Sequence, residues 1–155
     1  MTDPGSGVPI PVGESVPPVP ILPSRPACSG ATQANLEATI RGEAFADARY
    51  TSYAAHARST GLPRLARLWD NTASQELGEH FAQAAELSGL VGDNAANLRD
   101  SIGGEWYEAT VMYPSFSRAA AGVGDRQAAA LFREIALDEA GHAAAFLRAL
   151  VRLRV

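Results

Sequence analysis

The sequence predicts an all-α domain of four long helices that follows a proline-rich N-terminal segment. Most glycines and prolines of the 155 residues lie outside the stretches in which apolar side chains recur at steps of three and four. That spacing is the period of an α-helix. Alanine and aliphatic residues dominate these stretches, and the length is enough for one domain with a substantial core.

Charge and cysteine content exclude several classes of function. The net charge of −4 gives no electrostatic support for a nucleic acid or an anionic membrane as partner. Cys28 is the only cysteine, which excludes an intrachain disulfide, a four-cysteine iron site and an iron–sulfur cluster held by this chain alone. No run is apolar enough to span a membrane, and the start of the chain lacks a signal-peptide pattern. We therefore expect a cytoplasmic protein.

Residues 1–30 differ in composition from the rest of the chain. In residues 8–13 and 16–23, proline alternates with valine, isoleucine and leucine. Proline removes backbone donors and favours extended backbone. Such a segment is either a linker or a docking peptide for an unnamed partner. We expect residues 1–30 to form an extended tail and residues 31–155 to form the helical domain.

The first two helices are expected at residues 32–59 and 63–88. Glu43 interrupts the apolar face of the first helix, a face that also includes Tyr50. The turn between the helices contains Gly61, and the proline that follows suits the first turn of a helix. On the second helix, Glu76 and His80 lie on the predicted inner face.

The last two helices repeat this arrangement. The third is expected to begin near residue 95 and to carry Glu105 and Glu108, with a kink or local opening at Pro114. The fourth follows residues 122–125 and places Glu139 and His142 on its apolar face. Glu105 follows Glu43, and His142 follows His80, by the same 62 positions. Two helical hairpins with the same pattern, placed face to face, form a pseudo-two-fold cluster.

All four predicted helices thus carry an inward carboxylate, and two of them also carry an imidazole. An unpaired charge on an apolar face costs several kcal/mol unless it binds a metal or a counter-ion. Arginine pairing is the alternative, but the arginines lie mainly off these faces. Mixed carboxylate and imidazole ligands suit iron or manganese, and glutamates can bridge two metals. The candidate metal ligands are Glu43, Glu76, His80, Glu105, Glu108, Glu139 and His142.

Several motifs at these positions resemble one family. They are Gly42-Glu43, Tyr50, Gly61, Glu76 with a following histidine, Gly104-Glu-Trp-Tyr-Glu108, Met112-Tyr-Pro-Ser-Phe116 and Glu139-x-x-His142. The chain from about Gln33 to Leu150 resembles the diiron domain of the rubrerythrin family, a branch of the ferritin-like four-helix bundles. Glu-x-x-Glu followed by Met-Tyr-Pro is the most specific part of this resemblance.

The resemblance implies a centre of two iron ions, with manganese or a mixed pair as the alternative. It implies that the glutamates of all four helices are ligands or bridges. Glu108 would match the additional glutamate that alternates with a histidine as an iron ligand when the redox state changes. Tyr50 and Tyr113 would match tyrosines that lie beside the ligands and take part in the reaction, although core packing is the alternative role for each.

Two departures from the family pattern affect the site. The rubredoxin domain that follows in the family is missing from this sequence, so electrons are expected from a separate protein. The second helix reads Glu76-Leu-Gly-Glu-His80, which has one residue more than the family's Glu-x-x-His. Without a gap, Glu79 takes the place of the histidine. With one inserted residue, Gly78, absorbed as a π-bulge, His80 is the ligand, and we expect this second arrangement.

The short link between the second and third helices is the third departure. In ferritin-like bundles these two helices run parallel, so the connection has to span about 33 Å, or ~10 extended residues. Residues 89–94 supply only about six. We expect a swapped homodimer, in which two helices of one chain pair with two of the other. A monomer with up-down-up-down topology is the alternative.

The function implied by the resemblance is that of an enzyme, a non-haem diiron oxidoreductase that reduces hydrogen peroxide. The alternative is a ferroxidase that handles iron and is recruited as cargo through residues 1–30. A metal-free helical scaffold is the third possibility. The fold and the ligand set do not by themselves determine which substrate is used.

Overall fold

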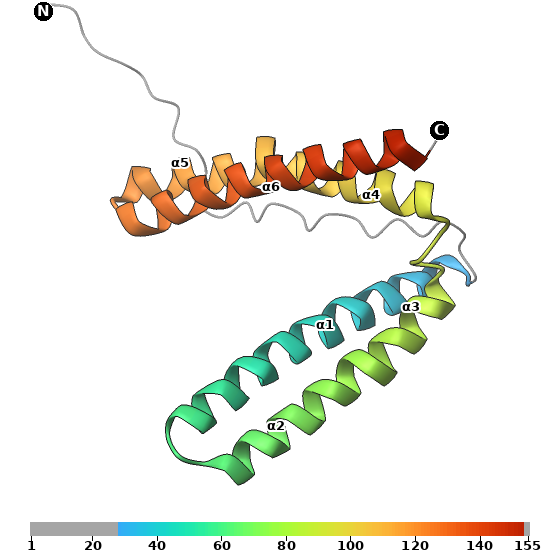
Figure 1. Ribbon diagram of the computed structural model, residues 1–155, viewed down its shortest axis with the longest axis vertical. Coiled ribbons are helices and arrows are strands. Elements are labelled where there is room, and N and C mark those ends of the chain that lie inside the picture. The colour runs from blue at the N-terminus through green and yellow to red at the C-terminus, as the bar shows by residue number, and fades with distance from the viewer. Residues whose placement is uncertain (1–27, 154–155) are drawn as a thin grey trace, which may run out of the picture. The chain divides into compact units, whose positions relative to one another are not determined.

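The computed structural model describes residues 28–153, which are all-α as predicted and contain no strand (Figure 1). Short π-helical segments (η) join α-helices end to end, so the eight segments make four long helices. The predicted proline-rich tail, residues 1–30, lies outside the described residues except for its last three. The segments are α1 Gly30–Ser59, α2 Pro63–Gln75, η1 Glu76–Phe81, α3 Ala82–Ser88, α4 Asn94–Tyr107, η2 Glu108–Met112, α5 Tyr113–Val123 and α6 Arg126–Leu153.

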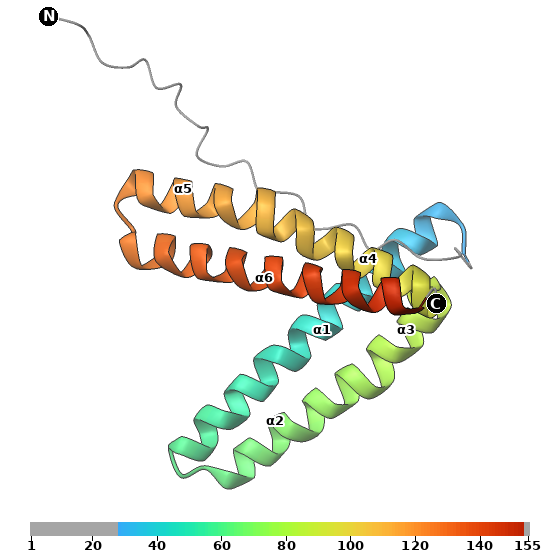
Figure 2. The same cartoon turned by 45° about the horizontal axis from the view of Figure 1, so that its top comes forward.

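The helices form two compact units, residues 28–94 and residues 95–153, and each unit is an antiparallel helical hairpin (Figure 2). In the first hairpin, α1 packs against the helix made of α2, η1 and α3. In the second, α6 packs against η2 and α5. Gly61 and Gly124 stand at the two turns with φ of +76° and +90°, a left-handed conformation that favours glycine. The four predicted helices are therefore present as two hairpins.

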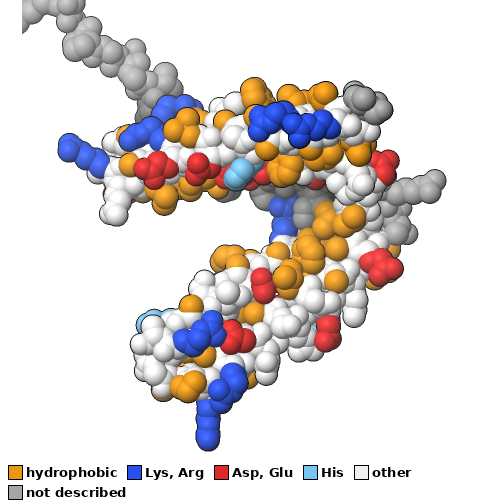
Figure 3. Space-filling model, viewed as in Figure 1, with side chains coloured by type: hydrophobic (Ala, Val, Ile, Leu, Met, Phe, Trp, Pro, Cys, Tyr) orange, Lys and Arg blue, Asp and Glu red, His pale blue; other side chains and the backbone are white. Residues whose placement is uncertain are grey.

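Small residues line the seam inside each hairpin. Most of the buried side chains are alanines, and Ile40 and Leu150 are the large exceptions in the described chain. Many large apolar side chains remain exposed, including Leu68 at 58% and Leu131 at 52%, and Figure 3 shows apolar side chains on the surface of both hairpins. Two helices can bury only one narrow seam between them. Each hairpin therefore keeps an apolar face that a further layer of helices would cover.

Polar contacts set the register of the helices within each hairpin. Near the turn of the first, Arg58 forms an ion pair with Asp70 at 2.7 Å. At its other end, Gln33 Nε2 donates a hydrogen bond to the carbonyl of Ser88 at 3.2 Å. In the second hairpin, the buried Ser117 hydroxyl donates to the carbonyl of Ala129 at 2.8 Å. None of the described helices is both long and apolar enough to cross a bilayer.

The offset between equivalent residues of the two hairpins changes along the chain, and the first change occurs at η2. Glu105 follows Glu43 by 62 positions, whereas Gly124 follows Gly61 by 63. The additional residue lies between them in η2, where the backbone N–H of Tyr113 bonds to the carbonyl five residues earlier. The local opening expected at Pro114 is thus a π segment that ends just before the proline, a residue that cannot donate a backbone hydrogen bond.

The second change in this offset occurs at η1 and returns it to 62 residues. Glu139 follows Glu76 by 63 positions, but His142 follows His80 by 62 again. This time the additional residue is in the first hairpin, within the π segment that contains Gly78. The predicted π-bulge in the second helix is confirmed. For the third helix, the sequence indicated only a kink or local opening at Pro114, because comparison at a single offset of 62 does not reveal the additional residue in η2.

Candidate metal centre

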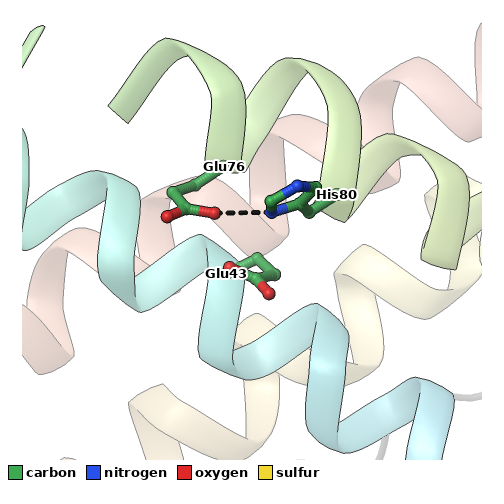
Figure 4. A group of neighbouring side chains, drawn as sticks. All are labelled: Glu43, Glu76 and His80. Atoms are coloured by element: carbon green, nitrogen blue, oxygen red, sulfur yellow. Dashed lines mark hydrogen bonds and ion pairs between the residues drawn. The ribbon is translucent and has the colours of Figure 1, made fainter. Parts of the chain in front are cut away.

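The first hairpin brings together Glu43, Glu76 and His80, which we call the first half-site (Figure 4). Glu43 projects from α1, and the other two residues project from η1. One ligand atom of each residue lies within 4.8 Å of the others. His80 Nδ1 donates a hydrogen bond to Glu76 Oε2 at 2.7 Å. The Glu76 side chain is 16% exposed and that of His80 is 48% exposed, so the half-site is open on one side.

The π segment decides which side chain joins the first half-site. Glu79 is exposed, and its carboxylate accepts a long hydrogen bond of 3.5 Å from Gln75 Nε2. His80 instead lies one wide turn after Glu76 and faces its carboxylate. The structure therefore places His80, rather than Glu79, beside Glu43. This arrangement agrees with the insertion at Gly78 that the sequence suggested.

The second hairpin brings together Glu105, Glu139 and His142, which we call the second half-site. Glu105 belongs to α4, and the other two residues lie three positions apart on the uninterrupted α6. His142 Nδ1 donates a hydrogen bond to Glu139 Oε2 at 2.6 Å and lies 3.3 Å from Glu105 Oε2. Side-chain exposure is 15% for Glu139, 23% for Glu105 and 59% for His142. Both half-sites thus pair shielded carboxylates with an exposed imidazole.

Burial and neighbouring carboxylates raise the pKa of several acids in these half-sites. Partial burial raises the pKa of Glu43 most, and the adjacent Glu76 raises it further, while His80 lowers it. Partial burial and then Glu139 raise the pKa of Glu105. A hydrogen bond to a carboxylate raises the pKa of the imidazole in the second half-site. Without a cation, Glu43 and Glu105 are therefore protonated more readily than an isolated glutamate.

One carboxylate oxygen of the second half-site accepts no hydrogen bond. Glu105 Oε2 is buried and has no hydrogen-bond partner. The closest donor, His142 Nδ1, bonds to Glu139 instead. A buried acceptor without a partner is costly, and a cation between the three side chains would satisfy it. Two carboxylates and an imidazole nitrogen converging within 4.8 Å fit the ligand preferences of iron or manganese.

Glu108 and Tyr113 lie in the electrostatic field of the second half-site. Partial burial raises the pKa of Glu108, and the charge of Glu139 raises it further. Burial also raises the pKa of Tyr113, and the next largest cause is the charge of Glu108. The position equivalent to Glu108 in the first hairpin, 62 residues earlier, is the buried Ala46. The two half-sites are therefore chemically different.

Tyr50 lies in another part of the first hairpin. Its ring stacks on Trp69 with centroids 5.1 Å apart and lies 6.3 Å from the ring of Tyr53. The residue is seven positions beyond Glu43, or about 10 Å along the helix. The sequence pattern around Glu43 and Tyr50 does not single out Tyr53 or Trp69. Comparison of the hairpins at an offset of 63 would have revealed the aromatic cluster.

The chain is similar to proteins that carry the same pattern. A family model described as rubrerythrin matches residues 77–150. Nigerythrin from Nitratidesulfovibrio vulgaris is 38% identical over 133 residues, which cover 77% of this chain and 66% of the relative. Rubrerythrin from Porphyromonas gingivalis is 34% identical over 135 residues, which cover 79% and 67%. The chain therefore spans about two thirds of the length of these curated relatives.

Among solved structures, the fully reduced, all-ferrous state of nigerythrin is 34% identical to this chain. The match covers 83% of this chain and 70% of that chain, with a TM-score of 0.43. Sequence identity over most of both chains, together with the rubrerythrin family model, establishes the relationship. The chain belongs to the rubrerythrin family.

Proposed function

We propose that this protein is a non-haem diiron oxidoreductase that reduces hydrogen peroxide with electrons from a separate donor protein. The rubrerythrin family binds a diiron centre. The observation that carries the proposal is the pair of half-sites, which together offer four carboxylates and two imidazoles. The unpartnered Glu105 Oε2 adds to this support, because a bound cation would satisfy it.

Each residue of the site has a distinct role in this proposal. Two iron ions bound there would supply the two electrons that one peroxide molecule takes up. Four glutamates hold the ions and balance their charge, namely Glu43, Glu76, Glu105 and Glu139. His80 and His142 complete the ligand set. Glu108 supplies a further carboxylate beside the second half-site, and its raised pKa suits a group that also carries a proton.

Stopped-flow mixing of the iron-loaded, reduced protein with peroxide and, separately, with O₂ tests this function. We expect peroxide to oxidise the centre faster than O₂ does, and Glu108→Gln to slow the peroxide reaction while iron stays bound. Glu86→Gln, an exposed glutamate of α3, is the matched control. Faster oxidation by O₂, with many Fe(II) ions oxidised per site, would contradict the peroxidase and indicate a ferroxidase.

We further propose that a complete site needs helices from two chains. Glu76 lies 12 residues before the end of α3 at Ser88, and Glu105 lies 11 residues after the start of α4 at Asn94. These distances are about 18 and 16 Å along the helices. If the two helices run parallel, as in the ferritin-like fold, the connection has to span about 34 Å, whereas residues 89–93 reach at most about 20 Å. A swapped homodimer removes this conflict.

Native mass spectrometry of the iron-loaded protein tests the dimer. We expect a mass of two chains that retains iron, and we expect metal removal to weaken the assembly because the ligands come from both chains. A single chain that keeps its iron at the same protein concentration would favour the up-down-up-down monomer. That result would leave the peroxidase proposal standing.

A further inference from the structure

Three aromatic rings that metal binding does not use pack together in the first hairpin. Tyr50 stacks on Trp69 at 27° with centroids 5.1 Å apart, and Trp69 meets Tyr53 nearly edge-on at 5.3 Å. Tyr53 is 45% exposed, whereas Tyr50 and Trp69 are half-buried. The three rings therefore make a continuous path from the inside of the hairpin to its surface. Phenol and indole side chains lose and regain single electrons readily.

The path begins near the first half-site on both helices. Tyr50 lies seven residues after Glu43 on α1, and Trp69 lies seven residues before Glu76 on α2. Seven residues are close to two full turns, so each ring shares a side of its helix with the carboxylate at a distance of about 10 Å along the axis. The aromatic cluster thus lies between the half-site and the turn at Gly61.

The second hairpin shows that packing alone does not require these ring types. At an offset of 63, the equivalents of Tyr50, Tyr53 and Trp69 are Tyr113, Phe116 and Phe132. Their centroids lie 5.5 to 6.3 Å apart, so the same cluster forms. Phenylalanine fills two of the three positions there. The hydroxyl of Tyr53 and the indole of Trp69 are therefore additional to what the packing needs.

The guanidinium of Arg49 lies beside the ring of Tyr50 and affects how readily that ring is oxidised. The guanidinium of Arg49 lies 5.6 Å from the centroid of Tyr50 and 5.2 Å from that of Phe45. A fixed positive charge over a ring opposes removal of an electron from it unless a proton leaves at the same time. Oxidation of Tyr50 is therefore expected to release its phenolic proton at the same time.

We propose that Tyr50, Trp69 and Tyr53 form a relay that carries excess oxidising equivalents from the metal centre to the surface of the first hairpin. This inference rests on the proposed reduction of peroxide. Reduction of peroxide needs two electrons. A metal centre that can give only one electron leaves the reduction one electron short. The phenol of Tyr50 supplies the missing electron and releases its proton to solvent.

The remaining steps return each residue to its starting state. The Tyr50 radical regains an electron from Trp69 and a proton from solvent. The Trp69 radical cation regains an electron from Tyr53, whose phenolic proton passes to solvent. A small thiol at the surface donates a hydrogen atom to the Tyr53 radical, and two thiyl radicals combine to a disulfide. The relay thus consumes thiol as reductant and spares the ligands from oxidation.

Pulse radiolysis of the full chain tests the relay without involving the metal. The chain has two tryptophans, so Trp106→Phe leaves Trp69 alone. After oxidation of this variant by azide radicals, we expect the indole radical to convert into a tyrosyl radical at a rate independent of protein concentration. Adding Tyr50→Phe and Tyr53→Phe should slow that conversion about tenfold or more. An unchanged rate, or one that depends on protein concentration, would overturn the relay.

Peptide mass spectrometry of the iron-loaded protein, exposed to excess peroxide without a donor, tests the link to the centre. We expect oxygen adducts at Trp69 and Tyr53 that disappear when a thiol is added. In Trp69→Phe, adducts should move to Tyr50 and to the peptides that carry the ligands. Trp106→Phe, the matched control, should behave like the natural protein, since Trp106 is 61% exposed and belongs to the other hairpin.

The same adduct pattern in Trp69→Phe and in the natural protein would also overturn the relay. Tyr53→Phe and Trp69→Phe should fold, because phenylalanine occupies the equivalent positions of the second hairpin. Tyr50→Phe should fold because it removes only the hydroxyl and keeps the ring. Equal thermal unfolding curves would verify this. A protein that consumes no peroxide would contradict the proposed function alone, because the radiolysis experiment measures electron transfer between the rings whether or not the metal reacts.

Discussion

At the scale of single residues, the candidate site consists of carboxylates that lie close together and have few hydrogen-bond donors beside them. Glu43 lies beside Glu76, and Glu105 lies beside Glu139, in positions where burial and mutual repulsion favour protonation. One oxygen of Glu105 has no hydrogen-bond partner. Such an arrangement is unfavourable in a metal-free protein and favourable around a cation.

Replacement of Glu139 by alanine should abolish tight metal binding at the second half-site. The carboxylate is both a proposed ligand and the partner of the His142 imidazole, so its removal also frees that ring. We expect affinity to fall by more than the ~10–100-fold typical of residues that only support a ligand. Metal content per chain, measured by elemental mass spectrometry, checks this.

Glu134→Ala is the matched control, since Glu134 is an exposed glutamate on the same helix. It should keep the metal content of the natural protein. Equal metal content in the two variants would show that the inward carboxylate is not a ligand. Circular dichroism of both would verify that α6 still forms.

The metal should stabilise the protein more strongly as the pH rises. The pKa values of Glu43 and Glu105 lie above the ordinary 4.5, and that of His142 lies above 6.5. These groups bind protons more tightly in the folded state than in the unfolded chain. Their stabilisation of the metal-free fold is therefore complete below the ordinary values and is lost as the pH rises through the raised ones.

The measurement compares the melting temperatures of the metal-free and iron-loaded protein from about pH 5 to pH 8. We expect the metal-free protein to lose stability over this range and the gap between the two forms to widen, because a metal competes with the same protons. A gap that does not change with pH would show that these groups do not exchange protons for metal.

At the scale of the helices, the π segment η1 gives the two half-sites the same set of side chains despite unequal spacings in the sequence. In α6, two residues separate Glu139 from His142, whereas in η1 three residues separate Glu76 from His80. A regular α-helix turns about 100° per residue, so an unabsorbed insertion would rotate the ligands that follow it away from the seam. The wider turn of η1 absorbs the additional residue locally.

Deletion of Gly78 should convert η1 into regular α-helix and keep the metal site. The pair Glu76 and His80 would then have the same separation as the pair on α6. We expect retained metal content and a melting temperature equal to or above that of the natural protein, because a helix-interior glycine costs about 1 kcal/mol. Elemental analysis and thermal unfolding measure the two effects.

Deletion of Ser74 is the control for that experiment, because it removes one exposed residue from the regular helix α2 instead. It should rotate Glu76 and the following residues relative to the preceding part of the helix, and metal should be lost. Similar behaviour of the two deletions would contradict the role given to the π segment.

At the scale of the whole molecule, each hairpin leaves a large apolar face uncovered. Leu131 shares the side of α6 that carries Glu139, and it is 52% exposed within its hairpin. Its equivalent in the first hairpin, Leu68, is 58% exposed. Because these apolar residues lie beside the candidate ligands at equivalent positions, we expect the half-site faces to be covered in the proposed dimer.

Leu131→Ala should therefore destabilise the assembled protein by about 2–5 kcal/mol, the cost of removing a buried leucine side chain. Leu137→Ala should change stability by only about 0.5 kcal/mol or less, since Leu137 is 74% exposed and lies on the opposite side of α6. Chemical unfolding of the two variants measures the difference. Equal, small effects would show that the half-site face stays open to solvent.

Much of the local architecture could be predicted from the chain itself. The helix at residues 63–88, the turns at Gly61 and Gly124, and the π-bulge around Gly78 all follow from short-range patterns, and the structure has them. The separate tail at residues 1–30, its docking partner and the ligand roles of the seven site residues remain predictions. Near Pro114 only a kink or local opening was predicted, and not the π segment itself, because one inserted residue changes the helical phase without changing the residue types.

The sequence by itself predicted the four helices, the family and the candidate metal ligands, because helical period, glycine turns and ligand spacing are local properties of the chain. Only the tertiary structure decided that His80 rather than Glu79 joins Glu43, that one oxygen of Glu105 lacks a partner, and that Tyr50, Trp69 and Tyr53 touch. These outcomes depend on how each helix is rotated about its axis relative to its neighbour. Packing within each hairpin sets that rotation, and no single stretch of the sequence specifies it.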